Sequence, residues 1–560
     1  MSNTPFEVCA GRPQFGAPDL ARLAQEFGAV HAWRSAMSAL PEQAAVEVKD
    51  EFAIGLHSET FGSFGAVDKF GIHALYWRVE GSRLLFAESA GALAGATGAI
   101  DSQAIFDYLY FHCIPSPRTI YKGVFRLPPG HCVKLKDGNL SVAPYWTPSF
   151  IQPPAAAVSF DALKVTFRER LQQAVARQLD GGTPACFLSG GTDSSTVAGM
   201  IGLATGQPAH SFSIGFEAAG YDEMAFARLV AGHFKTEHHE YYVTPADLVR
   251  SIPLVAQHYD QPFGNSSALP AYYCAKLACD AGVTRILAGD GGDELFGGNS
   301  RYAKQRIFGW YQQLPESLRT GLLQPLLEQS SLGTWPGLKK ARSYIEQARV
   351  PMPDRLQMYN LLMRLGITEV LTSEFLATVD SQGPQDLQRT VWRQAKTTSE
   401  LNRTLAFDWR FTLADSDLPK VRGTAALAGI DVAFPFLDED LTQFSAQLPD
   451  AYKLKGLKLR WFFKEALRGF LPDEVITKKK QGFGLPFGVW AVRHKPLMDL
   501  ATTSLQQLAK RGIVKPLFIK TLLEARLPEH PGYYGEMVWV LMMLEQWLQG
   551  HPAASLSTPG

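Results

Sequence analysis

The hydrophobic and polar positions follow two different patterns along the chain. Up to about residue 150, short apolar runs are separated by Gly, Asp and Ser, which predicts strands joined by turns; these runs fall at 51–56, 63–67, 75–79 and 83–87. After residue 160, strand-length apolar runs alternate with stretches of helical spacing, and the runs fall at 185–188, 209–214, 239–243 and 285–288. This alternation predicts a doubly wound parallel α/β sheet, which binds ligands at the carboxyl ends of its strands.

The two patterns divide the chain into domains. We expect a smaller β-rich (α+β) domain over 1–150 and an α/β domain over 159–550, joined by the Pro/Ala-rich linker IQPPAAAV at 151–158. Within the second domain, residues 305–404 are mostly of helical pattern and rich in Leu, Gln and Arg, which predicts a helical cover. The apolar run 537–544 is too short to span a bilayer and predicts a buried core helix. The tail 551–560 is expected to be flexible.

Composition narrows the class of protein. Hydrophobic residues make up 46% and charged residues 19% of the chain, which is typical of globular domains. The 54 basic and 54 acidic residues balance, so the total charge indicates neither a nucleic-acid nor a membrane partner. Six cysteines without CxxC spacing argue against a cysteine zinc site or a disulfide framework. With no secretion signal at the start, we expect a cytoplasmic protein.

The segment CFLSGGTDSSTVAGM, which begins at Cys186, carries the first candidate chemistry. An apolar strand runs into two glycines and several hydroxyl side chains, and a helical pattern follows. Such a turn directs backbone N–H groups, hydroxyls and the positive end of a helix dipole at one point, which suits a phosphate. A Ser/Gly turn that merely caps a helix is the alternative, and the lack of Gly-Lys-Ser/Thr excludes a Walker A loop.

A second glycine-rich segment, LAGDGGDELFGGNSRY at 287–302, holds Asp290, Asp293 and Glu294 close together. Acids beside a triphosphate need a cation between them, and Mg²⁺ prefers carboxylate and phosphate oxygens. An acidic surface turn is the alternative. His238 and His239 also resemble a metal signal, but neighbouring residues of a strand point to opposite faces.

SGGTDSS, GDGGDELFGG, DQPFGNSSALPAYY, LPKV and KKKQGFGLP occur in this order. Together they resemble the synthetase half of the asparagine synthetase family, an N-type ATP pyrophosphatase. The resemblance implies ATP and Mg²⁺ as cofactors, Asp193 and Asp293 as magnesium ligands, Asp290 near the activated carboxylate, and Lys480 on the pyrophosphate. It implies nucleotide or pyrophosphate contacts from Leu188, Ser189, Gly190, Gly191, Asp193, Ser194, Ser195, Ser213, Ile214, Gly215, Gly289 and Gly291.

The N-terminal segments VDKFG, FAES and TIYKGVFRLPPGH resemble the later part of the family's Ntn-type, class II amidotransferase glutaminase domain. Such a glutaminase needs a cysteine as its first residue after Met removal, so that the free α-amine can serve as base. Position 2 is Ser2, and Cys9 would need unusual processing. We therefore expect a degenerate, structural domain, as in the β-lactam synthetase and lasso-peptide cyclase branches.

Several positions depart from the family pattern on the substrate side. Gln261 and Asn265 stand where acids are expected, and Arg422 and Ala433 replace residues of a segment that borders the acceptor pocket. These changes put an aspartate-specific function in doubt.

We interpret the chain as an ATP-dependent amide ligase that adenylates a carboxylate, releases pyrophosphate and transfers the acyl group to ammonia or an amine, in asparagine biosynthesis or a related amidation. The carboxylate would belong to a small molecule or a peptide, ammonia could come from a separate glutaminase, and a homodimer is compatible. One alternative is a cyclase of the β-lactam synthetase or lasso-peptide type that uses a substrate amine. Another is a nucleotide-binding protein without chemistry.

Overall fold

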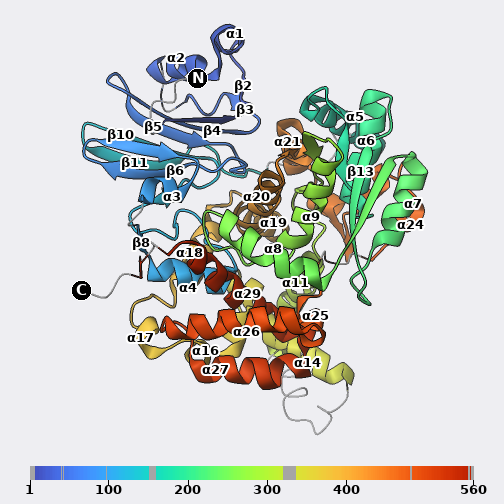
Figure 1. Cartoon of the computed structure of the whole chain (residues 1–560). Helices are drawn as coiled ribbons and strands as arrows, with labels where there is room; N and C mark the ends of the chain where they lie inside the picture. The colour runs from blue at the N-terminus through green and yellow to red at the C-terminus, as the bar shows by residue number, and fades with distance from the viewer. Residues whose placement is uncertain are drawn as a thin grey trace.

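The computed structural model describes residues 7–39, 41, 43–95, 98–150, 159–319, 336–479, 482, 484–552 and 555–556. Two larger antiparallel sheets form most of the N-terminal domain, seen in blue in Figure 1. One sheet has the order β1 (Val8–Gly11), β4 (Phe52–Ser58), β5 (Gly62–Val67), β10 (His131–Lys136) and β11 (Asn139–Pro144). The other has the order β7 (Arg83–Ala87), β6 (Tyr76–Glu80) and β9 (Phe125–Arg126). The four strands predicted in this region are confirmed as β4 to β7.

The strands of this domain bury side chains on both faces of the larger sheet. Between the two sheets, Trp77 and Phe86 pack with Val133. On the outer face, helix α2 (Ala29–Ala39) places Trp33 against Phe52, with a ring separation of 5.1 Å. Strands β4 and β5 are thus covered on both sides and are almost continuously buried, whereas β10 alternates and the edge strand β11 is mostly exposed.

A parallel sheet forms the centre of the C-terminal domain. Its order is β14 (Glu237–Val243), β13 (His210–Phe216), β12 (Ala185–Phe187), β15 (Arg285–Leu287) and β16 (Asp431–Ala433). The predicted doubly wound parallel sheet and its four predicted strands are therefore confirmed. Strand β16 was not predicted, because it has three residues and follows a long helical region.

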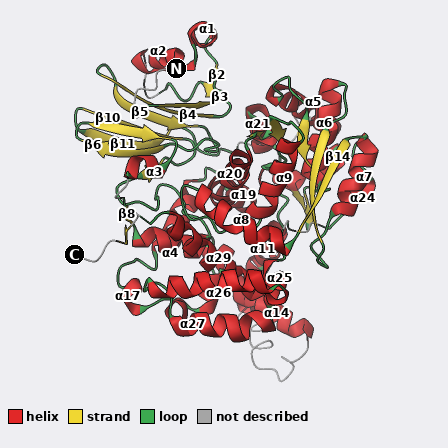
Figure 2. Cartoon of the chain, in the orientation of Figure 1, coloured by secondary structure: helices red, strands yellow, loops and turns green. Residues whose placement is uncertain are grey.

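Helices cover both faces of this sheet, as Figure 2 shows. One face carries α5 (Phe160–Gln178), α6 (Thr192–Thr205) and α7 (Met224–Phe234). The other carries α8 (Pro245–His258), α9 (Ala268–Asp280) and α20 (Leu418–Ala428), which lie between the parallel sheet and the N-terminal domain.

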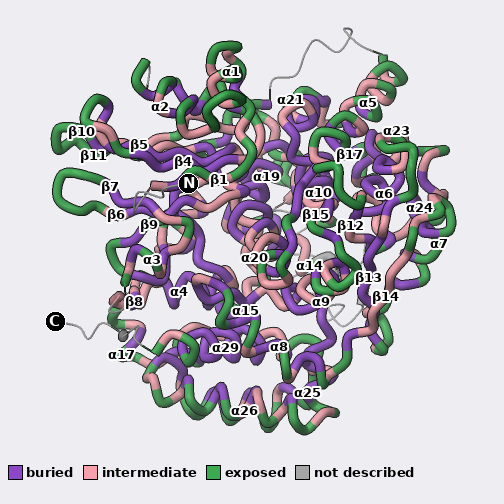
Figure 3. Tube along the Cα trace, turned by 45° about the horizontal axis from the view of Figure 1, so that its top comes forward, coloured by how far each residue is buried: buried purple, intermediate pink, exposed green. Residues whose placement is uncertain are grey.

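The helical cover and the core helix also appear as predicted. The described part of 305–404 is mostly helical, including α11 (Ser300–Gln313), α14 (Pro336–Arg349), α18 (Gly383–Gln394) and α19 (Glu400–Asp408). Helix α29 (Pro531–Gly550) buries Trp539 and Trp547. Much of its tube is purple in Figure 3. Across the described residues, helices long and apolar enough to cross a bilayer are absent.

Two further predictions concern the linker at 151–158 and the C-terminal tail at 551–560. The predicted linker, residues 151–158, lies outside the described residues. In the tail predicted to be flexible, β19 (Ser555–Leu556) pairs in parallel with β8 (Ala99–Ile100), because β8 presents a free edge to it. Residues 553–554 and 557–560 lie outside the described residues.

Candidate active site

The loop after β12 is held in one tight conformation. Gly190 has φ +69°, and a Cβ on it would lie 2.5 Å from Phe226 Cβ of α7, so a residue with a side chain does not fit there. Ser189 donates its backbone N–H to Ser194 Oγ at 3.1 Å, and the two hydroxyl oxygens lie 3.0 Å apart. Helix α6 begins at Thr192 directly after Gly191. The loop therefore presents a helix N-terminus and hydroxyl groups, the arrangement that suits a phosphate.

A second glycine-rich loop follows β15 and touches the first. The two loops meet because β12 and β15 are neighbours in the sheet, with Cys186 opposite Leu287. A Cβ on Gly289 would lie 2.9 Å from the backbone nitrogen of Ser194, and a Cβ on Gly292 would overlap the Asp193 carboxylate. Glycine at both positions is thus what allows the backbones of the two loops to approach.

Asp193 and Asp293 converge on one point, where Arg460 lies. The Arg460 guanidinium binds both oxygens of Asp193, with Nη1 2.9 Å from Oδ2, and the same Nη1 lies 3.0 Å from Asp293 Oδ1. Burial by itself lowers the pKa of Arg460, but the two carboxylates raise it above its usual value. Two convergent carboxylates beside a phosphate-type loop are a donor set that fits Mg²⁺.

A cavity of about 1050 Å³ opens over both loops. The predicted site residues that line it are Leu188, Ser189, Gly191, Asp193, Ser194, Ile214, Gly289, Asp290, Gly291 and Asp293. Its wall includes an apolar part with Phe212, Cys274 and Ile476, and a charged part that contains the two aspartates. A molecule with a flat apolar ring and a polyanionic chain matches this division.

Four predicted residues lie behind the cavity wall, although all belong to the described part of the chain. They are Gly190, Ser195, Ser213 and Gly215. Ser195 is fully buried in α6, and Ser213 donates its hydroxyl to Leu188 O, which fastens β13 to the end of β12. Gly190 and Gly215 are positions where a side chain would collide with Phe226 or Tyr242. These residues shape the loop rather than face the cavity.

Lys480 lies outside the described residues, so its contacts stay a prediction. Its neighbours Lys479 and Gly482 line the cavity, and so does Lys478. Lys478 is mostly buried: its Nζ lies 2.7 Å from Glu223 Oε1 and 4.2 Å from the centre of the Phe226 ring. Lys478 is therefore linked to the 189–194 loop through Phe226 of α7, which also lies beside Gly190.

A second charged group faces the cavity from α20. Lys420 donates to Asp417 Oδ1 at 2.7 Å, and both residues line the cavity with Asp290. Burial lowers the pKa of Lys420, but Asp417 and Asp290 together raise it above its usual value. Burial raises the pKa of Asp290 to about 6, although Lys420 counteracts this shift.

Three cations of the site were not predicted from the sequence: Arg460, Lys420 and Lys478. Lys420 and Arg460 belong to segments that matched the family pattern, LPKV and the stretch before KKKQGFGLP. Asp193 and Arg460 are 267 residues apart in the sequence. Local sequence patterns therefore did not indicate that these cations contact the loops.

The residues that depart from the family pattern have hydrogen-bond partners outside the cavity wall. Gln261 accepts a hydrogen bond from Ile120 N of the N-terminal domain at 2.9 Å, and Asn265 donates to Ser416 Oγ at 3.2 Å. Arg422 Nη1 lies 3.3 Å from His73 Nε2, also in the N-terminal domain. Among the described residues that form the cavity wall, Gln261, Asn265, Arg422 and Ala433 are absent. The segment that contains Arg422 does line the cavity, through Asp417, Lys420 and Val421, and its place beside an acceptor pocket stays a prediction. Gln261 and Arg422 themselves contact the N-terminal domain.

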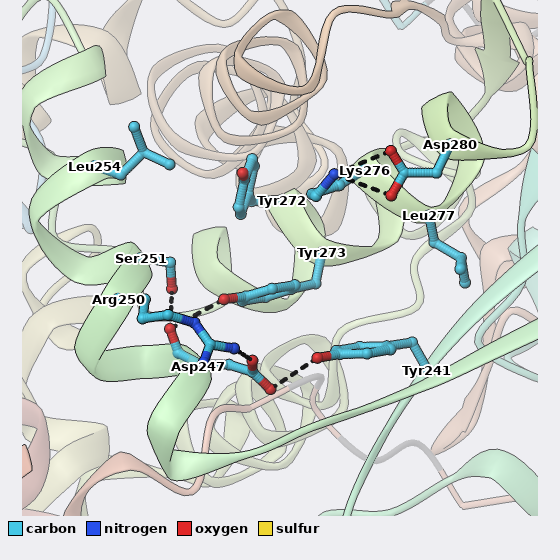
Figure 4. Close-up of a pocket in the computed structure, with 10 residues that line it drawn as sticks. All are labelled: Tyr241, Asp247, Arg250, Ser251, Leu254, Tyr272, Tyr273, Lys276, Leu277 and Asp280. Carbon is cyan, nitrogen blue, oxygen red and sulfur yellow. Dashed lines mark hydrogen bonds and ion pairs between the residues drawn. The ribbon is translucent and has the colours of Figure 1, made fainter.

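A smaller cavity of about 320 Å³ lies between α8, α9 and the end of β14 (Figure 4). Arg250 forms an ion pair with Asp247, which also accepts a hydrogen bond from Tyr241 at 3.0 Å. Lys276 is paired with Asp280 at 2.9 Å. Each cation that lines this cavity thus has an acid beside it, and the glycine-rich loops do not reach it.

Comparisons with known proteins agree with this geometry. A family model described as asparagine synthase matches residues 166–549, and one described as glutamine amidotransferase domain matches residues 35–146. The chain is 25% identical over 511 residues to asparagine synthetase (glutamine-hydrolyzing) 1 of Bacillus subtilis, covering 90% of this chain and 78% of that protein. It is 33% identical over 265 residues to a putative asparagine synthetase of Methanocaldococcus jannaschii, covering 46% and 50%. It is 23% identical to amidase chyE of Penicillium rubens, covering 78% and 70%. The chain belongs to the asparagine synthase family.

Proposed function

We propose that this protein activates a carboxylate with ATP, forms an acyl adenylate and pyrophosphate, and transfers the acyl group to ammonia or an amine. Family membership makes it an ATP-dependent amide ligase of the asparagine synthase type. The observation that carries the finer proposal is the convergence of Asp193 and Asp293 on one point, within a cavity that also holds the phosphate-type loop.

The proposed reaction needs little covalent participation by the protein. A carboxylate oxygen of the substrate attacks the α-phosphorus of ATP, and the bond to the bridging oxygen of the β-phosphate breaks, which releases pyrophosphate. The amine nitrogen then attacks the acyl carbon, AMP leaves, and the nitrogen loses a proton. Bound Mg²⁺, held by Asp193 and Asp293, would neutralise charge on the phosphates. The protein orients the reactants with the 189–194 loop and stabilises negative charge with its cations.

Asp290 and Lys420 are suited to the second half of the reaction. With a pKa of about 6, Asp290 is mostly ionised at neutral pH but is a stronger base than an ordinary aspartate. We assign to it the proton released by the attacking amine. Lys420 remains protonated beside it and stabilises the carboxylate. For Lys480, flanked by cavity residues, the proposed role is neutralisation of the departing pyrophosphate.

We further propose that the nitrogen is not released from glutamine by the N-terminal domain. The cysteine near the start of that domain, Cys9, is the second residue of β1, where it pairs with Ile54 of β4. Its nitrogen is part of a peptide bond, so it lacks the free α-amine that an N-terminal nucleophile uses as base. Ammonia, supplied freely or by a separate glutaminase, or a substrate amine is the proposed donor.

ATP–pyrophosphate exchange with a panel of small and peptide carboxylates tests the activation step. Exchange should appear with at least one carboxylate and fall at least about 100-fold in Asp193→Asn and Asp293→Asn, as expected when a transition-state charge contact is lost. Asp280→Asn, in the smaller cavity, is the matched control and should retain exchange. ATP binding without exchange on any carboxylate would refute the ligase proposal in favour of a nucleotide-binding protein.

The acceptor is tested next with ammonia, glutamine and amines. Product formation with ammonia but not with glutamine supports the proposed donor, whereas release of glutamate from glutamine by the purified chain would contradict it. A product that forms with no added amine would show that the substrate's own amine is the nucleophile, as in a cyclase.

A further inference from the structure

A group of metal-ligating side chains lies at the opposite end of the parallel sheet from the cavity. His210 is the first residue of β13, Glu237 is the first residue of β14, and the strand register places them side by side. His239, two residues after Glu237, points to the same face of the sheet because side chains alternate along a strand. Three residues of metal-binding types thus share one face of the sheet at the amino ends of β13 and β14. Strand β13 is labelled in Figure 1 and β14 in Figure 2.

The distances between these side chains suit a common ion. His210 Nε2 lies 3.5 Å from Glu237 Oε2, and His239 Nε2 lies 3.3 Å from Glu237 Oε1. One donor atom from each residue lies within 4.8 Å of the others. Ligands about 2.0–2.2 Å from a tetrahedral Zn²⁺ are about 3.3–3.6 Å apart. Each histidine nitrogen thus lies within this range of one Glu237 carboxylate oxygen, through a different oxygen in each case.

Two neighbouring rings, those of Phe212 and His210, restrict the orientation of the His239 side chain. Its ring stacks on the buried Phe212 ring at 4.7 Å and an angle of 9°, and lies nearly parallel to the His210 ring at 5.9 Å. His239 Nε2 is buried and makes no hydrogen bond, although it faces the Glu237 carboxylate. A buried nitrogen without a hydrogen bond loses free energy, which a metal bond would recover.

The neighbouring His238 provides an internal contrast. It points to the other face, where its Nδ1 lies 2.8 Å from Ser211 Oγ. Its Nε2 is also buried without a hydrogen bond, 3.4 Å from Glu240 Oε1, but the residue opposite it in β13 is Ser211 rather than a histidine. The adjacent histidines therefore do not act together. His239 acquires its partner, His210, from the neighbouring strand.

We propose that His210, Glu237 and His239 bind a divalent transition metal, with Zn²⁺ as the reference ion. Two imidazoles and a carboxylate suit zinc and related first-row metals, and three protein ligands leave one position for water. Glu237 is 62% exposed, so the ion can enter from solvent. Because β14 is an edge strand of the sheet, the ion would tie this edge to β13. Binding to the folded state alone would stabilise it.

Calorimetric titration of the untagged, chelator-treated full chain with ZnCl2 alone tests the proposal. We expect about one equivalent to bind, with an affinity at least about tenfold lower in His239→Ala and in Glu237→Gln. His238→Ala, on the opposite face, should bind as the wild type does. Asp193→Asn should also retain binding, which separates this site from the nucleotide cavity.

Co²⁺ in place of Zn²⁺ adds a readout that does not depend on stability. Its visible absorption should show a low-symmetry, nitrogen-ligated ion in the wild type and in His238→Ala, and should be lost in His210→Ala even where that variant's circular dichroism matches the wild type. Absence of stoichiometric binding to the wild type would overturn the proposal. Binding that survives both His239→Ala and Glu237→Gln, or that is lost in His238→Ala, would overturn it as well.

Discussion

Arg460 and Asp193 form a buried, two-point ion pair across 267 residues of chain, and the same guanidinium reaches Asp293 at 3.0 Å. The Arg460 side chain is 6% exposed and packs over the Phe463 ring at 4.3 Å. The Arg460 guanidinium thus lies between the two predicted magnesium ligands, Asp193 and Asp293. Arg460 keeps these two carboxylates close together.

Replacement of Arg460 by Met should leave the two carboxylates facing each other without a counter-charge. Removal of one partner from a buried ion pair costs about 3–5 kcal/mol, and the free energy of unfolding should fall by about this amount. Mg²⁺ should restore part of the loss, because it supplies the missing positive charge. Urea denaturation with and without MgCl2 measures both effects. Arg468→Met, which removes an arginine that is 51% exposed, is the control and should change stability by less than about 0.5 kcal/mol. An unfolding free energy of Arg460→Met equal to the wild type, or independent of Mg²⁺, would contradict this account.

Gly190→Ala should lower stability by more than the strain of an alanine in the left-handed backbone conformation. An alanine at φ +69° costs about 1–2 kcal/mol, and its Cβ would in addition collide with Phe226. Gly206→Ala is a matched control, since Gly206 has φ +71° at the end of α6 with open space around it. We expect the control to lose only the backbone contribution and to keep ATP–pyrophosphate exchange. Gly190→Ala should lose more stability and most of the exchange; equal losses in both variants would show that the loop tolerates the side chain.

Asp290→Asn should change how stability depends on pH. The pKa of Asp290 is raised from 3.8 to about 6 in the folded state, so the folded protein holds this proton more tightly than the unfolded chain does. Between about pH 4 and pH 6 the wild type therefore loses stability as pH rises, and the variant lacks this loss. Relative to the wild type, Asp290→Asn should gain stability from pH 4 to pH 7, as measured by chemical denaturation at several pH values. A constant difference over this range would show that the carboxyl pKa is not raised.

The same variant tests the proposed role of Asp290 as base. Amide formation by the wild type should rise as pH increases through about 6, because the carboxylate form accepts the proton from the amine. Asp290→Asn should form product at a much lower rate and without this rise. Pyrophosphate exchange, which precedes the amine's attack, should be affected less. A variant with normal amide formation would exclude Asp290 as the base.

Asp260→Ala should loosen the contact between the two domains. The Asp260 carboxylate accepts hydrogen bonds from Ser89 Oγ at 3.0 Å and from the backbone nitrogens of Ala90 and Gly91 at the start of α3 (Ala90–Ala94). Each buried N–H left without an acceptor costs about 1–3 kcal/mol. Hydrogen exchange should therefore speed up in α3 but not in β13, and pyrophosphate exchange should persist. Asp280→Ala, from an exposed pair with Lys276, is the control; unchanged protection of α3 in Asp260→Ala would contradict the assigned contact.

Much of the fold follows from local features of the chain. Short apolar runs predict β4 to β7 and β12 to β15, because burial of a strand requires consecutive or alternating apolar residues at that place. The two glycine-rich loops are recognisable locally as SGGTDSS and GDGGDELFGG. The reason for glycine at 190 and 292 is tertiary, because a side chain there would collide with Phe226 or Asp193. The order of these motifs was enough to predict the asparagine synthase family, and the alternation of strand-length runs with helical stretches predicted the parallel sheet.

The partners of these local features depend on tertiary structure. Arg460 reaches Asp193, Lys420 reaches Asp290, and Gln261 turns to Ile120 of the other domain only after distant elements pack together. His210 and His239 likewise meet through the register of two strands, whereas the adjacent His238 and His239 point apart. Hydrophobic periodicity and glycine content predict the secondary structure and the turns of a segment from residues close to it in the sequence. Side-chain partners are set by which elements share a surface, and that depends on the packing of the whole chain.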